Sequence, residues 1–204
     1  GILVQSTYIG GSREEKGNDI VFDQTGNIVI TGQTVSSDFP IVQPIIEGST
    51  TNNGYNAFLT KFDPTGQLQT SSYLGGSLND YGKAVTIANN GDIVVIGETW
   101  STDFPLVDAI QIIQSGYSDA FITRVDTAGD IVFSTLHGGA VREHVRDVAI
   151  DSADDILVLG QTDSEDFPVS ELFSGSGNGK NDGFLTKLTS TGALTFSRQF
   201  GGSE

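Results

Sequence analysis

The chain contains no cysteine and no methionine among its 204 residues. Without cysteine, disulfide bonds and thiolate chemistry are excluded, and the redox compartment leaves no trace in the sequence. Because translation starts at methionine, we expect a processed product or a part of a longer protein. The sequence also lacks a run of about 18 apolar residues, which excludes a membrane-spanning helix.

Basic residues are scarce, with 10 Lys and Arg against 26 Asp and Glu and a net charge of -16. A field of this sign repels phosphate backbones and anionic lipid surfaces, so we expect no nucleic acid partner and no membrane insertion. The hydrophobic share of 37% is ordinary for a globular protein. The 26 glycines indicate many turns.

Several motifs occur three times, in the same order and at a nearly constant spacing. Gly-Gly pairs start at Gly10, Gly75, Gly138 and Gly201, so the steps are 65, 63 and 63 residues. Asp-Phe-Pro keeps the same step and starts at Asp38, Asp103 and Asp166. A period of this length indicates repeated supersecondary units. Residues common to all copies are expected to serve the fold, whereas residues unique to one copy are candidates for a specific function.

Each copy contains four short apolar segments separated by turn signals, which predicts four strands. The first segment alternates, as at Val85 and Ile87, and the second is a continuous run, as at 93–96, expected for a strand covered on both faces. Short Asn/Asp/Gly turns follow the first and third segments. Long variable loops join the second and third segments, at 35–55, 100–118 and 163–181.

Four-stranded antiparallel units in tandem favour an all-β fold made of β-propeller blades. We expect blades at 10–74, 75–137 and 138–204, with 1–9 as the outer strand of a preceding or neighbouring blade. A β-solenoid is the alternative, but solenoid coils are usually shorter and lack a repeated pair of tight hairpins.

The ordered motifs also resemble a known family. The segments that carry the resemblance are Tyr-Leu-Gly-Gly-Ser at 73–77, Asn-Gly-Asp-Ile-Val-Val-Ile-Gly-Glu-Thr at 90–99, Ser-Thr-Asp-Phe-Pro at 101–105 and Asp-Ala-Phe-Ile-Thr-Arg at 119–124. Together they are similar to the bacterial SBBP-type β-propeller repeat. The resemblance implies blades of large secreted or cell-surface proteins, an extracellular or cell-surface location, and no general catalytic residues.

Three blades are too few for a closed ring, since propellers usually have about four to eight. Two explanations stay open, and we favour the first: the chain is an excerpt of a longer array, or strands are exchanged between chains. Exchange would make the protein a self-assembling structural subunit, because open head-to-tail contacts propagate into filaments. The expected partners are accordingly other blades of a longer chain or other copies of the same chain.

Charged residues recur at three positions of the repeat. The basic column is Lys61, Arg124 and Lys187, and the acidic columns are Glu15, Asp80 and Glu143, and Asp38, Asp103 and Asp166. A lone buried charge costs several kcal/mol, so we expect ion pairs or hydrogen bonds from carboxylates to backbone amides of their loops. A ring of charges that binds a ligand is the alternative.

The long loops and the loops after Gly-Gly, at 12–17, 77–82 and 140–145, are expected to share one face of the disk, because meander topology brings both out on the same side. Trp100, Tyr55 and Tyr117 in or beside these loops could stack on sugars or anchor a protein partner. Arg142 and His144 could contact an anionic partner. The alternatives are that Trp100 packs between blades and that the charged loop pairs internally.

Metal and catalytic motifs are absent. The acidic turns at 151–155 and 178–182 lack the spacing of a calcium-binding loop, so we expect no metal or other cofactor, with calcium as the alternative. Neither His137 nor His144 lies in a zinc or triad motif. We therefore expect a non-catalytic scaffold or a protein- or glycan-interaction module. The alternatives are the self-assembling subunit and part of a carbohydrate-processing enzyme.

Overall fold

The computed structural model describes residues 1–3, 5–47, 54–170 and 181–202. This part of the chain contains twelve strands and no helix. The strands are β1 (Glu15–Phe22), β2 (Ile28–Thr34), β3 (Asn56–Phe62), β4 (Leu68–Leu74), β5 (Asp80–Ile87), β6 (Ile93–Thr99), β7 (Asp119–Val125), β8 (Ile131–His137), β9 (Glu143–Ile150), β10 (Ile156–Thr162), β11 (Asp182–Leu188) and β12 (Leu194–Phe200). Among the described residues, no helix is long and apolar enough to span a membrane.

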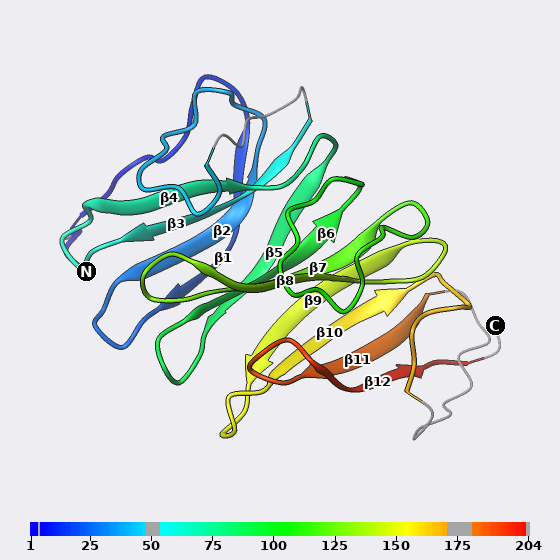
Figure 1. Cartoon of the computed structure of the whole chain (residues 1–204). Coiled ribbons are helices and arrows are strands. Elements are labelled where there is room, and N and C mark those ends of the chain that lie inside the picture. The colour runs from blue at the N-terminus through cyan, green and yellow to red at the C-terminus, as the bar shows by residue number, and fades with distance from the viewer. Residues whose placement is uncertain (4, 48–53, 171–180, 203–204) are drawn as a thin grey trace.

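The strands form three four-stranded antiparallel sheets, β1–β4, β5–β8 and β9–β12, each in chain order. The sheets fall within residues 10–74, 75–137 and 138–204. Figure 1 shows them following one another, from blue and cyan through green to yellow and red, with the chain ends on opposite sides. The all-β, repeated architecture predicted from the sequence is confirmed.

Successive sheets pack against one another through their first strands. Strand β5 contacts β1, β2 and β3, and β9 contacts β5, β6 and β7. One apolar cluster joins Val29 and Leu59 of the first sheet to Val85 of the second. A larger one joins Val94 and Ile122 of the second sheet to residues of the third, such as Val148. The core therefore lies between sheets as well as within them.

The middle strands differ in burial along the molecule. Every residue of β6 is buried, which confirms that this strand is covered on both faces. In β2 and β10, buried residues alternate with more exposed ones, so the same expectation is wrong for the first and third copies. The reason is that no described sheet covers the outer face of the first or of the third sheet.

The first strand of each sheet starts earlier than the sequence suggests. Glu15, Asp80 and Glu143 open β1, β5 and β9, so the loops after Gly-Gly end before these acids. No strand is assigned within the described part of 1–9, where Gln5 Nε2 donates to the carbonyl of Thr65 at 2.7 Å. The outer strand expected at 1–9 stays a prediction.

The long loops fold back over the last strand of their own sheet. Val42 bridges Ser71 and Val107 bridges Ser134 in antiparallel fashion. At the equivalent place in the third sheet, the amide of Ser170 donates to the carbonyl of Ser197 at 2.9 Å. These contacts cover part of the outer sheet edges, which would otherwise offer unpaired backbone groups.

Candidate functional site

The loops after Gly-Gly are held by the Asp-Phe-Pro loops. The carboxylates of Asp38 and Asp103 accept hydrogen bonds from the backbone amides of Ser12 and Ser77, each at 2.8 Å. Asp166 accepts from the amide of Ala140 at the same distance. These backbone donors lower the pKa of Asp38 and Asp103. Both sets of loops therefore lie at one end of the sheets.

The acids that open the first strands bond to the end of the second strand. Glu15 and Glu143 accept from the hydroxyls of Thr34 and Thr162 at 2.8 and 2.9 Å. Asp80 bonds to Thr99 in the same way. Asp80 and Glu143 are completely buried, and burial raises the pKa of each to about 7.

A second buried carboxylate lies beside Glu143. Asp119 Oδ1 and Glu143 Oε2 both have no hydrogen-bond partner, although both side chains are buried. They converge on Gly138, where an added Cβ would lie 2.7 and 2.5 Å from them. Burial raises the pKa of Asp119 to about 7, with the charge of Glu143 adding to the shift. Two such carboxyls at one place favour sharing a proton over ionising together.

The described residues contain no group of three or more His, Cys, Asp or Glu side chains arranged to hold a metal ion. The acidic turn at 151–155 is instead engaged with Lys187, whose ammonium lies 2.7 Å from Asp151 and 3.0 Å from Asp155. Residues 178–180 of the other acidic segment lie outside the described residues.

The other two cations of the basic column also lie in third strands and form ion pairs. Lys61 lies 3.1 Å from Asp23. Arg124 is buried and contacts Asp92 at 2.8 Å and Asp154 at 2.6 Å. Because Asp154 belongs to the third sheet, Arg124 links two sheets. Asp154 adopts a φ of 68° in a turn where the other copies have glycine, and its carboxylate also accepts from the amide of Asn89 at 2.8 Å.

A polar hollow of about 490 Å³, here called the inner-strand pocket, lies where the first strands of the three sheets meet. Its lining residues are Lys16, Asn18, Gln33, Tyr81, Lys83, Glu98, Trp100, Val145 and Arg146. It takes residues from β1, β5 and β9 and from the ends of β2 and β6, so all three sheets are needed to shape it.

Aromatic rings continue from this pocket to the long loop of the first sheet. The ring centroid of Tyr81 lies 5.3 Å from that of Trp100 and 5.3 Å from that of Tyr55. Lys83 Nζ lies 5.3 Å from the Tyr81 ring centroid. Glu98 is buried between Lys83 at 3.2 Å and His144 Nδ1 at 3.4 Å.

The structure thus brings together three of the residues singled out in the sequence: Tyr55, Trp100 and His144. Arg142 and Tyr117 form a separate pair, with the guanidinium 5.5 Å from the ring centroid. The sequence-based set lacks Tyr81 and Lys83, although aligning the copies offers a signal. Tyr81 stands where the other copies have Lys16 and His144.

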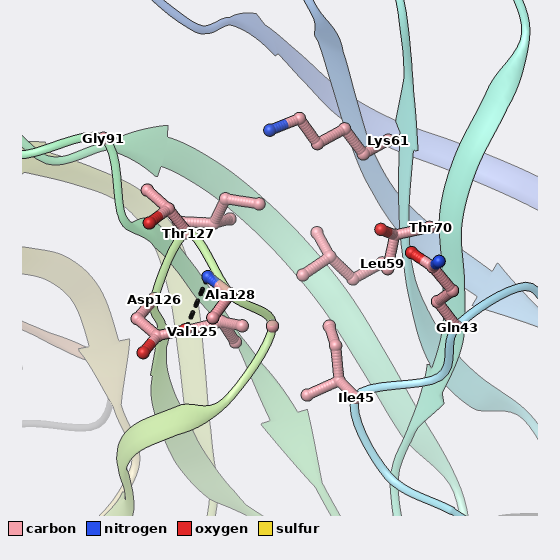
Figure 2. A pocket seen from close by; sticks show the side chains of 12 residues that line it. Gln43, Ile45, Leu59, Lys61, Thr70, Gly91, Val125, Asp126, Thr127 and Ala128 are labelled. Atoms are coloured by element: carbon pink, nitrogen blue, oxygen red, sulfur yellow. Dashed lines mark hydrogen bonds between the residues drawn. The ribbon is translucent and has the colours of Figure 1, made fainter.

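A second, smaller hollow of about 120 Å³ lies between the first and second sheets. Figure 2 shows Ile45 and Leu59 on one side of it and Val125, Thr127 and Ala128 on the other. Its lining mixes apolar side chains with those of Gln43, Lys61, Thr70, Asp126 and Thr127. Lys61 is already paired with Asp23, so we interpret the hollow as a packing gap between sheets.

His137 is a packed residue. Burial lowers its pKa to about 4, so the ring is neutral near pH 7. Its Nε2 lies 2.9 Å from the hydroxyl of Thr186 and 3.1 Å from that of Ser197. The ring meets Phe167 edge-on at 4.8 Å. All three partners belong to the third sheet or its loop, so His137 contributes contacts between the second sheet and the third.

No family model matches the chain, so the resemblance to SBBP repeats stays a prediction. The regulatory protein FlaEY of Caulobacter vibrioides is 25% identical over 175 residues, covering 80% of this chain and 18% of that protein. The chain therefore spans less than a fifth of the length of this relative.

Two solved structures are similar in shape. A protein of unknown function from Dyadobacter fermentans matches with a TM-score of 0.51 and 13% identity, over 97% of this chain and 53% of that one. A eukaryotic initiation factor matches with a TM-score of 0.47 and 11% identity, over 92% of this chain and 33% of that one. At such low identity, the first of these likenesses concerns the fold alone.

Proposed function

We propose that the chain is a non-catalytic segment of a β-propeller that serves as scaffold and interaction module within a larger extracellular or cell-surface protein. The observation that supports this most strongly is the unequal burial of equivalent positions. Positions whose apolar side chains fill the two junctions between sheets also carry apolar side chains on the two outermost faces. No described sheet covers them there.

The N-terminal end face is formed by β1. Ile20 is 57% exposed, whereas the equivalent Val85 and Val148 are 5% and 7% exposed because each packs on the preceding sheet. Phe22, two residues further along the same strand, is 65% exposed. These two side chains are suited to pack on another sheet in the way that β5 and β9 do.

The C-terminal end face is formed by the third sheet. Leu159 is 42% exposed, whereas the equivalent Ile96 is completely buried. Leu157 and Leu185 are partly exposed, although their counterparts in the second sheet, Val94 and Ile122, are completely buried against the third. This face is suited to receive the first strand of a further blade.

The two end faces are complementary halves of one interface that the chain already uses twice. Covering each exposed apolar side chain contributes about 1.5–3 kcal/mol at most. Further blades of the same kind are therefore the favoured partners at both ends. The small share of FlaEY that this chain spans supports the idea of a segment within a longer protein.

Sedimentation equilibrium tests this proposal, because an isolated chain with two complementary open faces should self-associate. We expect the apparent mass to rise with concentration, and the double variant Ile20→Asp with Leu159→Asp to sediment as a monomer. Ile112→Asp is the matched control, since Ile112 is exposed but lies in a loop away from both end faces. A parent chain that stays monomeric throughout, or association that survives the double variant, would contradict the proposal.

The same end faces support a second function, that of a self-assembling structural subunit. In that case the N-terminal face of one copy packs on the C-terminal face of the next, and assembly gives closed rings or open filaments. Electron microscopy of concentrated protein separates the two functions. Regular rings or filaments support the subunit, whereas short, irregular oligomers support the segment of a longer array.

A further inference from the structure

The inner-strand pocket concentrates positive charge in an acidic protein. Lys16, Lys83 and Arg146 line it, which places three of the chain's ten basic residues around one hollow. Glu98 is the one carboxylate among the described lining residues. Because the whole chain has a net charge of -16, this local excess of cations stands out, and it is suited to bind an anionic partner.

The three cations differ in how they are engaged. Lys83 lies 3.2 Å from buried Glu98 and over the Tyr81 ring, so it is fixed in place. Lys16 and Arg146 are exposed and form no ion pair with the described residues; Arg146 donates to the side-chain oxygen of Gln161 at 2.8 Å. Two cations are thus free to meet an anion at the pocket.

The acids on the same strands that could neutralise these cations accept hydrogen bonds from backbone amides instead. Asp19 accepts from the backbone amides of Ile20 and Val85, each at 2.8 Å. Asp147 accepts from the amide of Val148 at 2.9 Å. Neither forms an ion pair with Lys16 or Arg146 in the described part of the chain.

The remaining lining groups are suited to hydrogen-bond to the hydroxyls of a saccharide and to pack against its rings. Asn18 Nδ2 donates to Gln33 Oε1 at 2.8 Å and to the carbonyl of Gly82 at 2.6 Å. This leaves the Asn18 oxygen as an acceptor and the Gln33 amide as a donor. Trp100 and Tyr81 add aromatic surface, on which the C–H face of a pyranose ring can pack.

We infer that the inner-strand pocket binds a short saccharide that carries carboxylate groups, such as an oligomer of uronic acids. One carboxylate lies against Lys16 and another against Arg146, while the ring between them packs toward Trp100. A uronate carries one charge per ring, and phosphates carry about two, so the acidic chain opposes the uronate less. This inference deepens the proposed interaction role and depends on it.

Trp100 provides the test, because it is the only tryptophan of the chain and lines the pocket. The probe is a trimer of galacturonate, titrated into the folded chain while tryptophan fluorescence is recorded. The neutral galactose trimer and inorganic phosphate at equal ionic strength are the comparison probes. We expect a saturable change with the galacturonate trimer alone, weakened by added salt.

Variants then assign the response to the pocket. Lys16→Gln with Arg146→Gln should weaken binding about tenfold, since two partly exposed charge contacts are lost. Arg142→Gln is the matched control, because Arg142 lies outside the pocket against Tyr117. Isothermal titration calorimetry gives an independent reading of the same affinities.

Three results would overturn the inference. They are no fluorescence change and no heat with the galacturonate trimer, an equal response to the galactose trimer or to phosphate, and undiminished binding by the double variant. None of them bears on the end faces, whose sedimentation test stands independently. Failure of the sedimentation test contradicts the proposed function itself, whatever the saccharide result.

Discussion

The two junctions between sheets are built from the same repeat but are held differently. Between the first and second sheets, Lys61 pairs within its own sheet and a gap of about 120 Å³ remains (Figure 2). Between the second and third sheets, buried Arg124 reaches across to Asp154, and His137 bonds to the third sheet. Arg124, His137 and Asp154, which depart from the repeat, therefore add links across the second junction, whereas Asn18 and Asp19 bond to backbone groups across the first.

The buried polar groups differ in the same way. At the first junction, Asn56 lies beside Asp80, so one neutral side chain meets one acid near Gly75. At the second, Asp119 takes the place of Asn56 and meets Glu143. The first junction can thus stay uncharged with one proton, whereas the second has two acids to neutralise. The comparison teaches that the strength of the tighter junction also depends more on pH, because that junction contains two acids of raised pKa and the first contains one.

Removing the cation that crosses the second junction should have the largest effect. Arg124→Met leaves Asp92 and Asp154 without their partner, and breaking a buried pair in this way costs about 3–5 kcal/mol. Lys61→Met is the matched variant, with an expected loss of about 0–1 kcal/mol because its pair is partly exposed. The free energy of unfolding by urea measures both. Equal losses of unfolding free energy in the two variants would contradict the claim that the two junctions are held differently.

Protonation of the second junction should have a smaller effect. The pKa of Asp119 and of Glu143 is about 7 in the folded protein, above the ordinary values of 3.8 and 4.5. The folded state therefore holds more protons than the unfolded state between about pH 4 and pH 7. From these two groups, the free energy of unfolding is greatest below this window and falls as the pH rises through it.

Asp119→Asn tests this, since it copies the residue that the first sheet has at the same place. When the pH rises from about 4 to about 8, the free energy of unfolding should fall by about 1–3 kcal/mol less in the variant than in the parent chain. Asp80 also has a pKa of about 7 and keeps its own share of the pH dependence in both proteins. Identical pH profiles of melting temperature for parent and variant would contradict proton sharing at Gly138.

Much of the fold could be predicted because strands, turns and repeats are local patterns. The alternation at Val85 and Ile87, the continuous run at 93–96 and the Asn/Asp/Gly turns identify four strands per copy without knowledge of distant contacts. The starts of β1, β5 and β9 were harder, since Glu15, Asp80 and Glu143 look like loop residues until their bonds to the end of the second strand are seen.

The candidate site could be predicted only in part. Trp100 and Tyr55 stood out by residue type, but their meeting through Tyr81 depends on how the second sheet packs on the first. The convergence of Lys16, Lys83 and Arg146 has the same origin, because each comes from a different sheet. Periodicity describes each sheet separately and contains no distance between sheets.

The central claim is that the two end faces form a third junction like the two inside the chain. Cross-linking tests it directly, since the absence of native cysteine makes every introduced thiol unique. Ile20→Cys and Leu157→Cys occupy the positions of Val85 and Val29, which share one apolar cluster at the first junction. With a short bis-maleimide, a mixture of the two variants should give a linked dimer, and each variant alone should stay unlinked. No dimer from the mixture, or equal dimer from each variant alone, would contradict the claim.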